Sequence, residues 1–267
     1  QQTRNLAILD SISKINTNWG NEIFRPASFS NHQLTLSGGT GKTRFYSSLG
    51  LYNEEGTTLR TDMKRVTLRN NIDFTDDRFT MAAGLNLGYT KRNFEQSSAF
   101  NTSNPFATSA LAVPYHLVKK ADGTYQTGIG TKFVGTNQLD QTFYDQNYSD
   151  QFKGIASLSF SYKLTDHLTA DIVSGIDFRE TQATNYGSKL VFTRLNSSSI
   201  TGRAGFQLES LNRFLTGTVR PSLTYRRNMN ENHDFEVSTI GEYIREYAKV
   251  FSVQAFGTDP KRPNTIA

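Results

Sequence analysis

The sequence predicts an all-β fold of antiparallel, up-and-down strands, about eight in number. Three features support this expectation. Apolar and polar residues alternate with a period of two, the connections between the alternating segments are short and long in turn, and aromatic residues stand at the ends of the most regular segment.

The most regular segment is 79–90, in which every second residue is apolar and those between are polar or small. The preceding segment, 66–74, alternates in the same way, with Asn70 as an exception on its apolar face. The polar link at 75–78 has the length that closes a tight hairpin. Two neighbouring antiparallel strands are therefore predicted.

Three further hairpins are predicted on the same grounds. The first pairs 31–37 with 44–53 through a link at 38–43, where glycine supplies the positive φ of a tight turn. The second pairs 152–164 with 168–178, and Ile155 is out of phase. The third pairs 213–227 with 233–250, and its outer half is less regular.

The connections alternate in length. They are short at 38–43, 75–78, 165–167 and 228–232, and longer at 54–63, 92–151 and 180–212. In an up-and-down sheet all the short connections share one rim, and outer-membrane β-barrels have this asymmetry. A soluble β-sandwich also alternates apolar and polar residues, so a sandwich adhesin or glycan-binding module is an alternative.

Dimensions and charge placement favour the membrane. The ten steps from Phe79 to Tyr89 make roughly 33 Å of strand, which a tilt of about 40° projects to roughly 25 Å, the height of a barrel's apolar band. An arginine facing lipid at mid-depth would cost about 2–4 kcal/mol, so charges opposite the apolar face should point into the lumen. The predicted lumen-facing residues are Arg65, Arg69, Asp73, Asp171 and Asp177, and the predicted lipid-facing residues are Phe79, Met81, Leu85, Leu87, Tyr89, Ile172 and Phe178.

Composition argues against several other classes. The chain has no cysteine, so a disulfide or thiolate metal site is impossible. Its formal charge of +5 comes from scattered lysine and arginine, which is typical of a solvated surface rather than a nucleic-acid interface. The opening Gln1-Gln2-Thr3-Arg4 has no features of an export signal, so we expect a removed signal or a segment of a longer protein.

Several motifs resemble, in order and spacing, the barrel of SusC-like (SusC/RagA) TonB-dependent transporters, and the likeness covers nearly the whole chain. The motifs are NWGNEIFR at 18–25, NHQLTLSGG at 31–39, KTRFY at 42–46, YNEEG at 52–56, KRVTLRNNID at 64–73, NPF at 104–106, DGTY at 122–125 and NHDF at 232–235.

The resemblance implies part of a 22-stranded barrel in the bacterial outer membrane. Such a protein imports a bulky nutrient, glycan or peptide, with a SusD-like surface lipoprotein as its lid and energy from the TonB complex. It is not an enzyme and needs no cofactor. We find no TonB box or plug domain, and 257–267 reads as a polar loop, so we expect TonB contact through a missing N-terminal region and completion by the rest of the same barrel.

The predicted organisation is a lead-in segment, 1–30, and a partial barrel, 31–267, with long loops at 92–151 and 180–212. Loops of this length without structure are uncommon unless they bind or move. Candidate contacts with substrate or lid are the loop aromatics Phe106, Tyr115, Tyr125, Phe133 and Tyr144. The alternative is that these side chains fold the loop onto itself.

No catalytic or metal site is predicted. The histidines His32, His116, His167 and His233 have no metal-binding spacing, and the sequence has no nucleophile elbow or P-loop. A self-contained eight-stranded barrel enzyme is a further alternative, and it would need a closing strand near Ala267.

Overall fold

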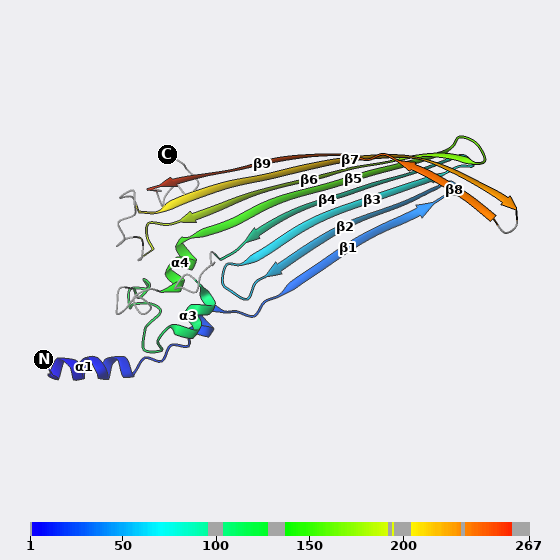
Figure 1. The fold of residues 1–267 in the computed structure, drawn as a ribbon. Helices are drawn as coiled ribbons and strands as arrows, with labels where there is room; N and C mark the ends of the chain where they lie inside the picture. Colours follow the sequence, from blue (N-terminus) through cyan, green and yellow to red (C-terminus); the bar gives the residue numbers. More distant parts are fainter. Residues whose placement is uncertain are drawn as a thin grey trace.

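The computed structural model describes residues 2–95, 104–127, 137–191, 194, 204–230 and 233–257, and one antiparallel sheet dominates it (Figure 1). The strands follow one another in the order β1 to β8, and β9 pairs with β7. The predicted up-and-down, antiparallel β architecture is confirmed. Across the described residues β1 does not pair with β8 or β9, so the sheet is open.

The strands are long and are joined alternately at the two ends of the sheet. Their bounds are β1 (Phe29–Gly39), β2 (Thr43–Glu55), β3 (Asp62–Thr75), β4 (Phe79–Asn93), β5 (Gln146–Lys163), β6 (Leu168–Gly187), β7 (Phe206–Asn230), β8 (His233–Ile240) and β9 (Tyr243–Phe256). The helices are α1 (Gln2–Ser13), α2 (Trp19–Ile23), α3 (Pro105–Leu111) and α4 (Gln138–Tyr144). No helix within the described ranges is both long and apolar enough to cross a membrane.

The sequence predicts one strand over 233–250, and the structure has two consecutive strands there, β8 and β9. Both strands pair with β7, and the break between them lies opposite Pro221. The Gly241 amide donates to the Pro221 carbonyl at 3.0 Å, but proline has no N–H with which to return the bond. One missing ladder bond therefore interrupts an otherwise continuous strand.

The two long loops are shorter than predicted. β6 continues to Gly187 and β7 begins at Phe206, so their connection is 188–205 rather than 180–212. Likewise β4 ends at Asn93 and β5 begins at Gln146, so 92–151 shrinks to 94–145. The prediction was wrong there because the backbone ladder continues beyond the point where apolar alternation stops.

The buried hydrophobic residues lie at the long-loop end, and Tyr186, near the end of β6, is one of them. Trp19, Ile23 and Leu139 pack together there, with Phe24, Leu59, Ala112, Val118 and Tyr125 against them. We call this region the loop cluster and define it as 15–28, 56–61, 104–127 and 137–145. The predicted lead-in 1–30 contributes α2 to this cluster, and its last two residues already belong to β1.

Candidate functional site

The register of the sheet separates its two faces. Directly paired residues of antiparallel strands share a face, so each unbroken series of partners crosses the sheet on one side. One such series is entirely apolar or glycine and runs Leu34, Leu49, Leu68, Leu87, Gly154, Phe178, Leu215 and Tyr247. We call the face that carries this series the outer face and the opposite one the inner face.

The outer face holds all seven residues predicted to face lipid, namely Phe79, Met81, Leu85, Leu87, Tyr89, Ile172 and Phe178. These seven side chains are exposed or half-exposed, and Ile172, for example, is 41% exposed. Other apolar residues of this face are exposed as well, such as Leu34 at 72%. Within the described residues a single sheet is present, so no second sheet covers this face. The β-sandwich alternative is therefore wrong.

The apolar band on the outer face drifts along the strands. On β4 and β5 the band ends at the charged pair Lys91–Asp150. On β6 and β7 it ends at the charged pair Glu180–Arg213, which lies two residues closer to the short turns. The border at the short turns shifts in the same direction, from the pair Phe79–Tyr162 on β4 and β5 to the pair Leu168–Tyr225 on β6 and β7. A drift of one residue per strand corresponds to a strand tilt of about 35°, as barrel closure requires.

Polar residues interrupt the outer face at several places, two of which stand out. Asn70, the exception noted in the sequence, accepts a hydrogen bond of 2.7 Å from the Ser47 hydroxyl on the neighbouring strand. Arg245 of β9 lies opposite Gly217 and so also falls on this face. Sequence reasoning missed Arg245 because the alternation in its strand is irregular.

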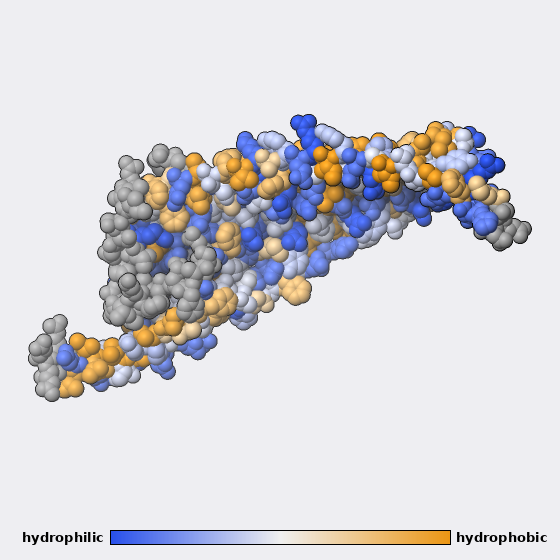
Figure 2. Space-filling view, viewed as in Figure 1, coloured by the Kyte–Doolittle hydropathy of each residue, from blue (hydrophilic) through white to orange (hydrophobic). Residues whose placement is uncertain are grey.

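The inner face is polar and carries all five residues predicted to face the lumen: Arg65, Arg69, Asp73, Asp171 and Asp177. Figure 2 shows the hollowed side of the sheet as mainly hydrophilic. A depression of about 480 Å³ lies over β1 to β5, and the cations Arg65, Arg69 and Lys153 line it. Out-of-phase Ile155 is one of the few apolar side chains at its edge.

The loop cluster is fixed by hydrogen bonds between distant segments. The Trp19 indole donates to the Val113 carbonyl at 3.0 Å, and the Thr17 amide donates to the Pro114 carbonyl at 2.7 Å. The Asn137 side chain caps α4 by accepting from the Leu139 amide and donates to the Val118 carbonyl at 2.8 Å. The segment predicted as a structureless loop is thus partly a packed unit.

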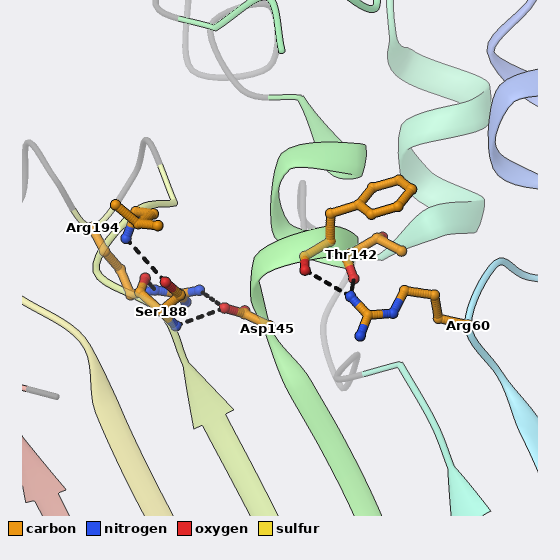
Figure 3. A network of polar contacts seen from close by, with 7 residues as sticks. Arg60, Thr142, Asp145, Ser188 and Arg194 are labelled. Atoms are coloured by element: carbon orange, nitrogen blue, oxygen red, sulfur yellow. Dashed lines mark hydrogen bonds and ion pairs between the residues drawn. The ribbon is translucent and has the colours of Figure 1, made fainter. Parts of the chain in front are cut away.

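A polar network joins the loop cluster to the ends of β5 and β6 (Figure 3). Arg60 donates to the carbonyls of Thr142 at 2.9 Å and Phe143 at 2.6 Å, at the end of α4. Asp145 forms an ion pair with Arg194 and accepts from the Ser188 amide at 2.8 Å. Burial raises the pKa of the Asp145 carboxyl, and the Arg194 guanidinium opposes this shift. These contacts tie three connections of one rim together.

A pocket of about 270 Å³ adjoins this network, with Glu95 and Asp145 among its lining residues. Burial raises the pKa of Glu95, against a hydrogen bond from Thr142 that lowers it. Among the described residues, no group of three or more His, Asp or Glu side chains is placed to hold a metal ion.

The aromatic candidates divide into two kinds. Phe106, Tyr115 and Tyr144 are exposed, at 64%, 46% and 38%, and Phe106 also lies against Phe24, with ring centroids 5.2 Å apart. Tyr125 packs onto the core of the loop cluster and stacks on Phe143 at 5.5 Å, and burial raises its pKa to about 12. Phe133 lies outside the described residues.

Sequence reasoning missed the helices of the loop cluster, although their start signals are present. Asn104 precedes Pro105 and accepts from the amides of Phe106 and Ala107. Asn137 stands in the same position before α4. Asparagine at the N-cap with proline at the first helical position is a known helix-start pattern that could have located α3.

Comparison with known proteins gives two sets of relatives. The chain is 25% identical over 248 residues to TonB-dependent receptor P3 and 25% identical over 200 residues to TonB-dependent receptor P39, both of Formosa agariphila. These matches cover 90% and 75% of the chain but only 23% and 18% of the relatives. No family model matches. The chain therefore spans less than a quarter of the length of the curated relatives it matches.

Solved structures share the fold. The RagAB peptide transporter aligns with a TM-score of 0.74 at 18% identity, over 92% of this chain and 28% of that one. The RagAB peptide importer in its "open-open" state aligns with a TM-score of 0.70, also at 18% identity, over 94% of this chain and 29% of that one.

The open, tilted sheet with one apolar and one polar face defines a segment of an outer-membrane β-barrel. The comparisons agree with this class: the relatives that the chain matches in sequence are named TonB-dependent receptors, and the fold is shared with RagAB over nearly the whole chain.

Proposed function

We propose that this chain forms part of the wall and the outer rim of an importer of bulky nutrients that acts with a SusD-like surface lipoprotein. One observation carries the proposal: a single continuous register puts apolar residues on one face and charged residues on the other. A sheet of this kind is stable where lipid wets one side and water or protein fills the other.

The outer face would contact the bilayer through the seven residues from Phe79 to Phe178 named above. The inner face would line the lumen, with Arg65, Arg69, Asp73, Asp171 and Asp177 pointing into it. The drift of the apolar band supports this assignment, because tilted strands in a flat membrane must present successively shifted segments to the lipid.

The loop cluster would form the extracellular rim, where substrate and lipoprotein arrive. Phe106, Tyr115 and Tyr144 support this role, since exposed aromatic side chains on a rigid base suit both stacking and protein contacts. Tyr125 has a structural role in the same cluster. Energy would come from the TonB complex, through a region of the whole protein outside this chain.

Peptide is the substrate class to test first, because the structural neighbours are described as peptide transporters and importers. Cells that carry the full-length protein and its lipoprotein should take up a labelled oligopeptide, and deletion of TonB should stop uptake. Uptake that continues without TonB would contradict the proposal. Growth on a glycan alone, with no peptide uptake, would move the substrate to the glycan class.

The orientation of the faces has its own test. A bimane label on Leu85→Cys in the full-length protein should be quenched by brominated lipids, and a label on Ser157→Cys should not. Ser157 follows Ala156, the direct partner of Leu85, and points to the other face. Equal quenching at both positions would contradict the assignment of faces.

A further inference from the structure

The depression on the inner face is built into the sheet by glycine. Gly50, Thr67 and Gly88 are direct partners on β2, β3 and β4. Thr67 therefore has no side chain beside it on either neighbouring strand. A Cβ at Gly50 would lie 2.5 Å from the Thr67 hydroxyl oxygen, so a larger residue there would displace Thr67. The three residues form the floor of the depression.

Three cations surround this floor. Arg65 and Arg69 lie two residues to either side of Thr67 on the same face of β3, and Lys153 is the direct partner of Gly88. None of the described residues that line the depression is acidic. All three cations are exposed, so a ligand in the depression could reach them.

The two arginines contact neutral groups. The Arg65 Nε donates to the Thr90 hydroxyl at 3.2 Å, and the Arg69 guanidinium carbon lies 5.8 Å from the centroid of the Tyr46 ring. Neither arginine has an ion-pair partner among the described residues. Both guanidinium groups therefore keep N–H donors for an incoming anion.

Most carboxylates of the inner face lie elsewhere. Glu54 is nearer, but it accepts a hydrogen bond of 2.9 Å from the hydroxyl of Tyr52, the direct partner of Arg65, and does not line the depression. Asp177 is in the same cross-strand series as Arg69 but three strand spacings away, about 14 Å. Asp73 is paired with Arg44, nearer the short turns. The positive charge of the depression is consequently a local feature and not a property of the whole wall.

We propose that the depression binds a carboxylate of the imported substrate, so that this transporter prefers acidic peptides; this inference rests on the import of peptides proposed above. Arg65 and Arg69 bind the carboxylate by charge-assisted hydrogen bonds, and Lys153 adds a point charge. The amide side chains of Gln33, Asn86 and Gln151, which also line the depression, supply donors and acceptors for the peptide backbone.

The test uses the full-length transporter with its lipoprotein and two C-terminally amidated hexapeptides that carry the same uncharged dye and differ only by aspartate against asparagine at two central positions. The wild-type complex should bind the aspartate peptide at least about tenfold more tightly, and the preference should shrink as salt is raised. The double variant Arg65→Gln/Arg69→Gln should bind both peptides equally, with the affinity for the asparagine peptide unchanged.

Arg220→Gln is the matched control, because Arg220 is an exposed inner-face arginine on β7, four strand positions from β3. It should keep the preference. Equal affinity of the wild type for the two peptides, or loss of the preference in the control, would overturn the proposal. So would weaker binding of both peptides by the double variant, since the arginines would then hold another part of the protein.

These outcomes are separable from failure of the proposed function. If both peptides are taken up equally well in a TonB-dependent way, the proposed import function holds and only the preference for acidic peptides is wrong. Binding of trigalacturonate, with no binding of either peptide, overturns the assignment to peptide while import itself stands.

Discussion

The spanning sheet and the loop cluster are stabilised in different ways. On the outer face of the sheet large apolar side chains are exposed, such as Leu34 at 72% and Leu49 at 41%, and the strands are joined by their backbone ladder. In the loop cluster Trp19, Ile23 and Leu139 are at most 4% exposed, and side chains bond distant segments together. The sheet needs lipid to bury its apolar surface, whereas the loop cluster carries its own core.

This difference makes the two regions separable by mutation. A change in the core of the loop cluster should open the rim and leave the strands paired, and a change on the outer face should do the reverse. All experiments below refer to the full-length protein in lipid.

The largest expected effect tests the core of the loop cluster. Trp19→Ala removes the largest buried side chain of this core and the hydrogen bond to the Val113 carbonyl, so opening of the cluster should become easier by about 3–5 kcal/mol. Hydrogen exchange of amides in 104–127 measures it. Phe106→Ala, at an exposed position, should change exchange little. Faster exchange throughout β2 to β5 would contradict the separation of the two regions.

The next effect tests the sheet. Leu85→Arg places a charge near the middle of the apolar band and should destabilise folding into lipid by about 2–4 kcal/mol. Ser157→Arg, on the inner face of the neighbouring strand, is the control and should cost much less. Urea titration in vesicles measures both variants. If Ser157→Arg were the more destabilising of the two, the faces would have to be exchanged.

The same contrast explains what the sequence predicts well. Within the apolar band each residue from Phe79 to Tyr89 has one of two environments, so a period of two reveals both the strand and its faces. The polar links at 75–78 and 165–167 mark tight turns for the same reason, since the band ends there.

Beyond the band this signal disappears. The outer-face residues Glu180, Gln182 and Thr184 on β6 are polar although the ladder to β7 continues through them. Neither face touches lipid there, so the pattern no longer distinguishes strand from loop. The ladder is set by the neighbouring strand, which a single-sequence pattern does not reveal.

The loop cluster was hardest to predict because its core comes from distant segments. Trp19 and Leu139 are far apart in sequence, and α2 has only five residues, too few to show a helical period. The N-cap asparagines were the local signals available. The inner depression was equally hidden, since it depends on the pairing of Gly50 with Thr67 and Gly88.

A smaller effect tests one of these caps. Asn104→Ala removes the acceptor for the Phe106 and Ala107 amides, at 2.9 and 3.3 Å, and should destabilise α3 by about 1 kcal/mol. Asn104→Ser keeps a capping oxygen and should retain most of the stability. Hydrogen exchange in 105–112 reports the difference. Equal loss in both variants would show that the cap is not what the asparagine contributes.

The last prediction separates the two regions by pH. His116 is 5% exposed beside Trp19, its Nε2 has no hydrogen-bond partner, and burial lowers its pKa below 6.5. Below pH 6.5 the opened cluster therefore binds a proton that the closed cluster excludes. Stability of the closed form is complete above this pH and falls as the pH drops toward the lowered pKa, by at most about 1.4 kcal/mol per pH unit.

Exchange in 104–127, measured from pH 7 to pH 5.5 and corrected for the intrinsic rate, should show this loss, and His116→Phe should remove it. Asp145 and Glu95 act in the opposite sense, because their pKa values are raised above 3.8 and 4.5, so protonation favours the closed form. Their contribution grows as the pH falls through the raised pKa of each carboxyl toward 3.8 and 4.5. Since the spanning strands contain no comparable buried histidine among the described residues, exchange in β3 and β4 should not follow pH, and an equal response there would mean that sheet and rim open together.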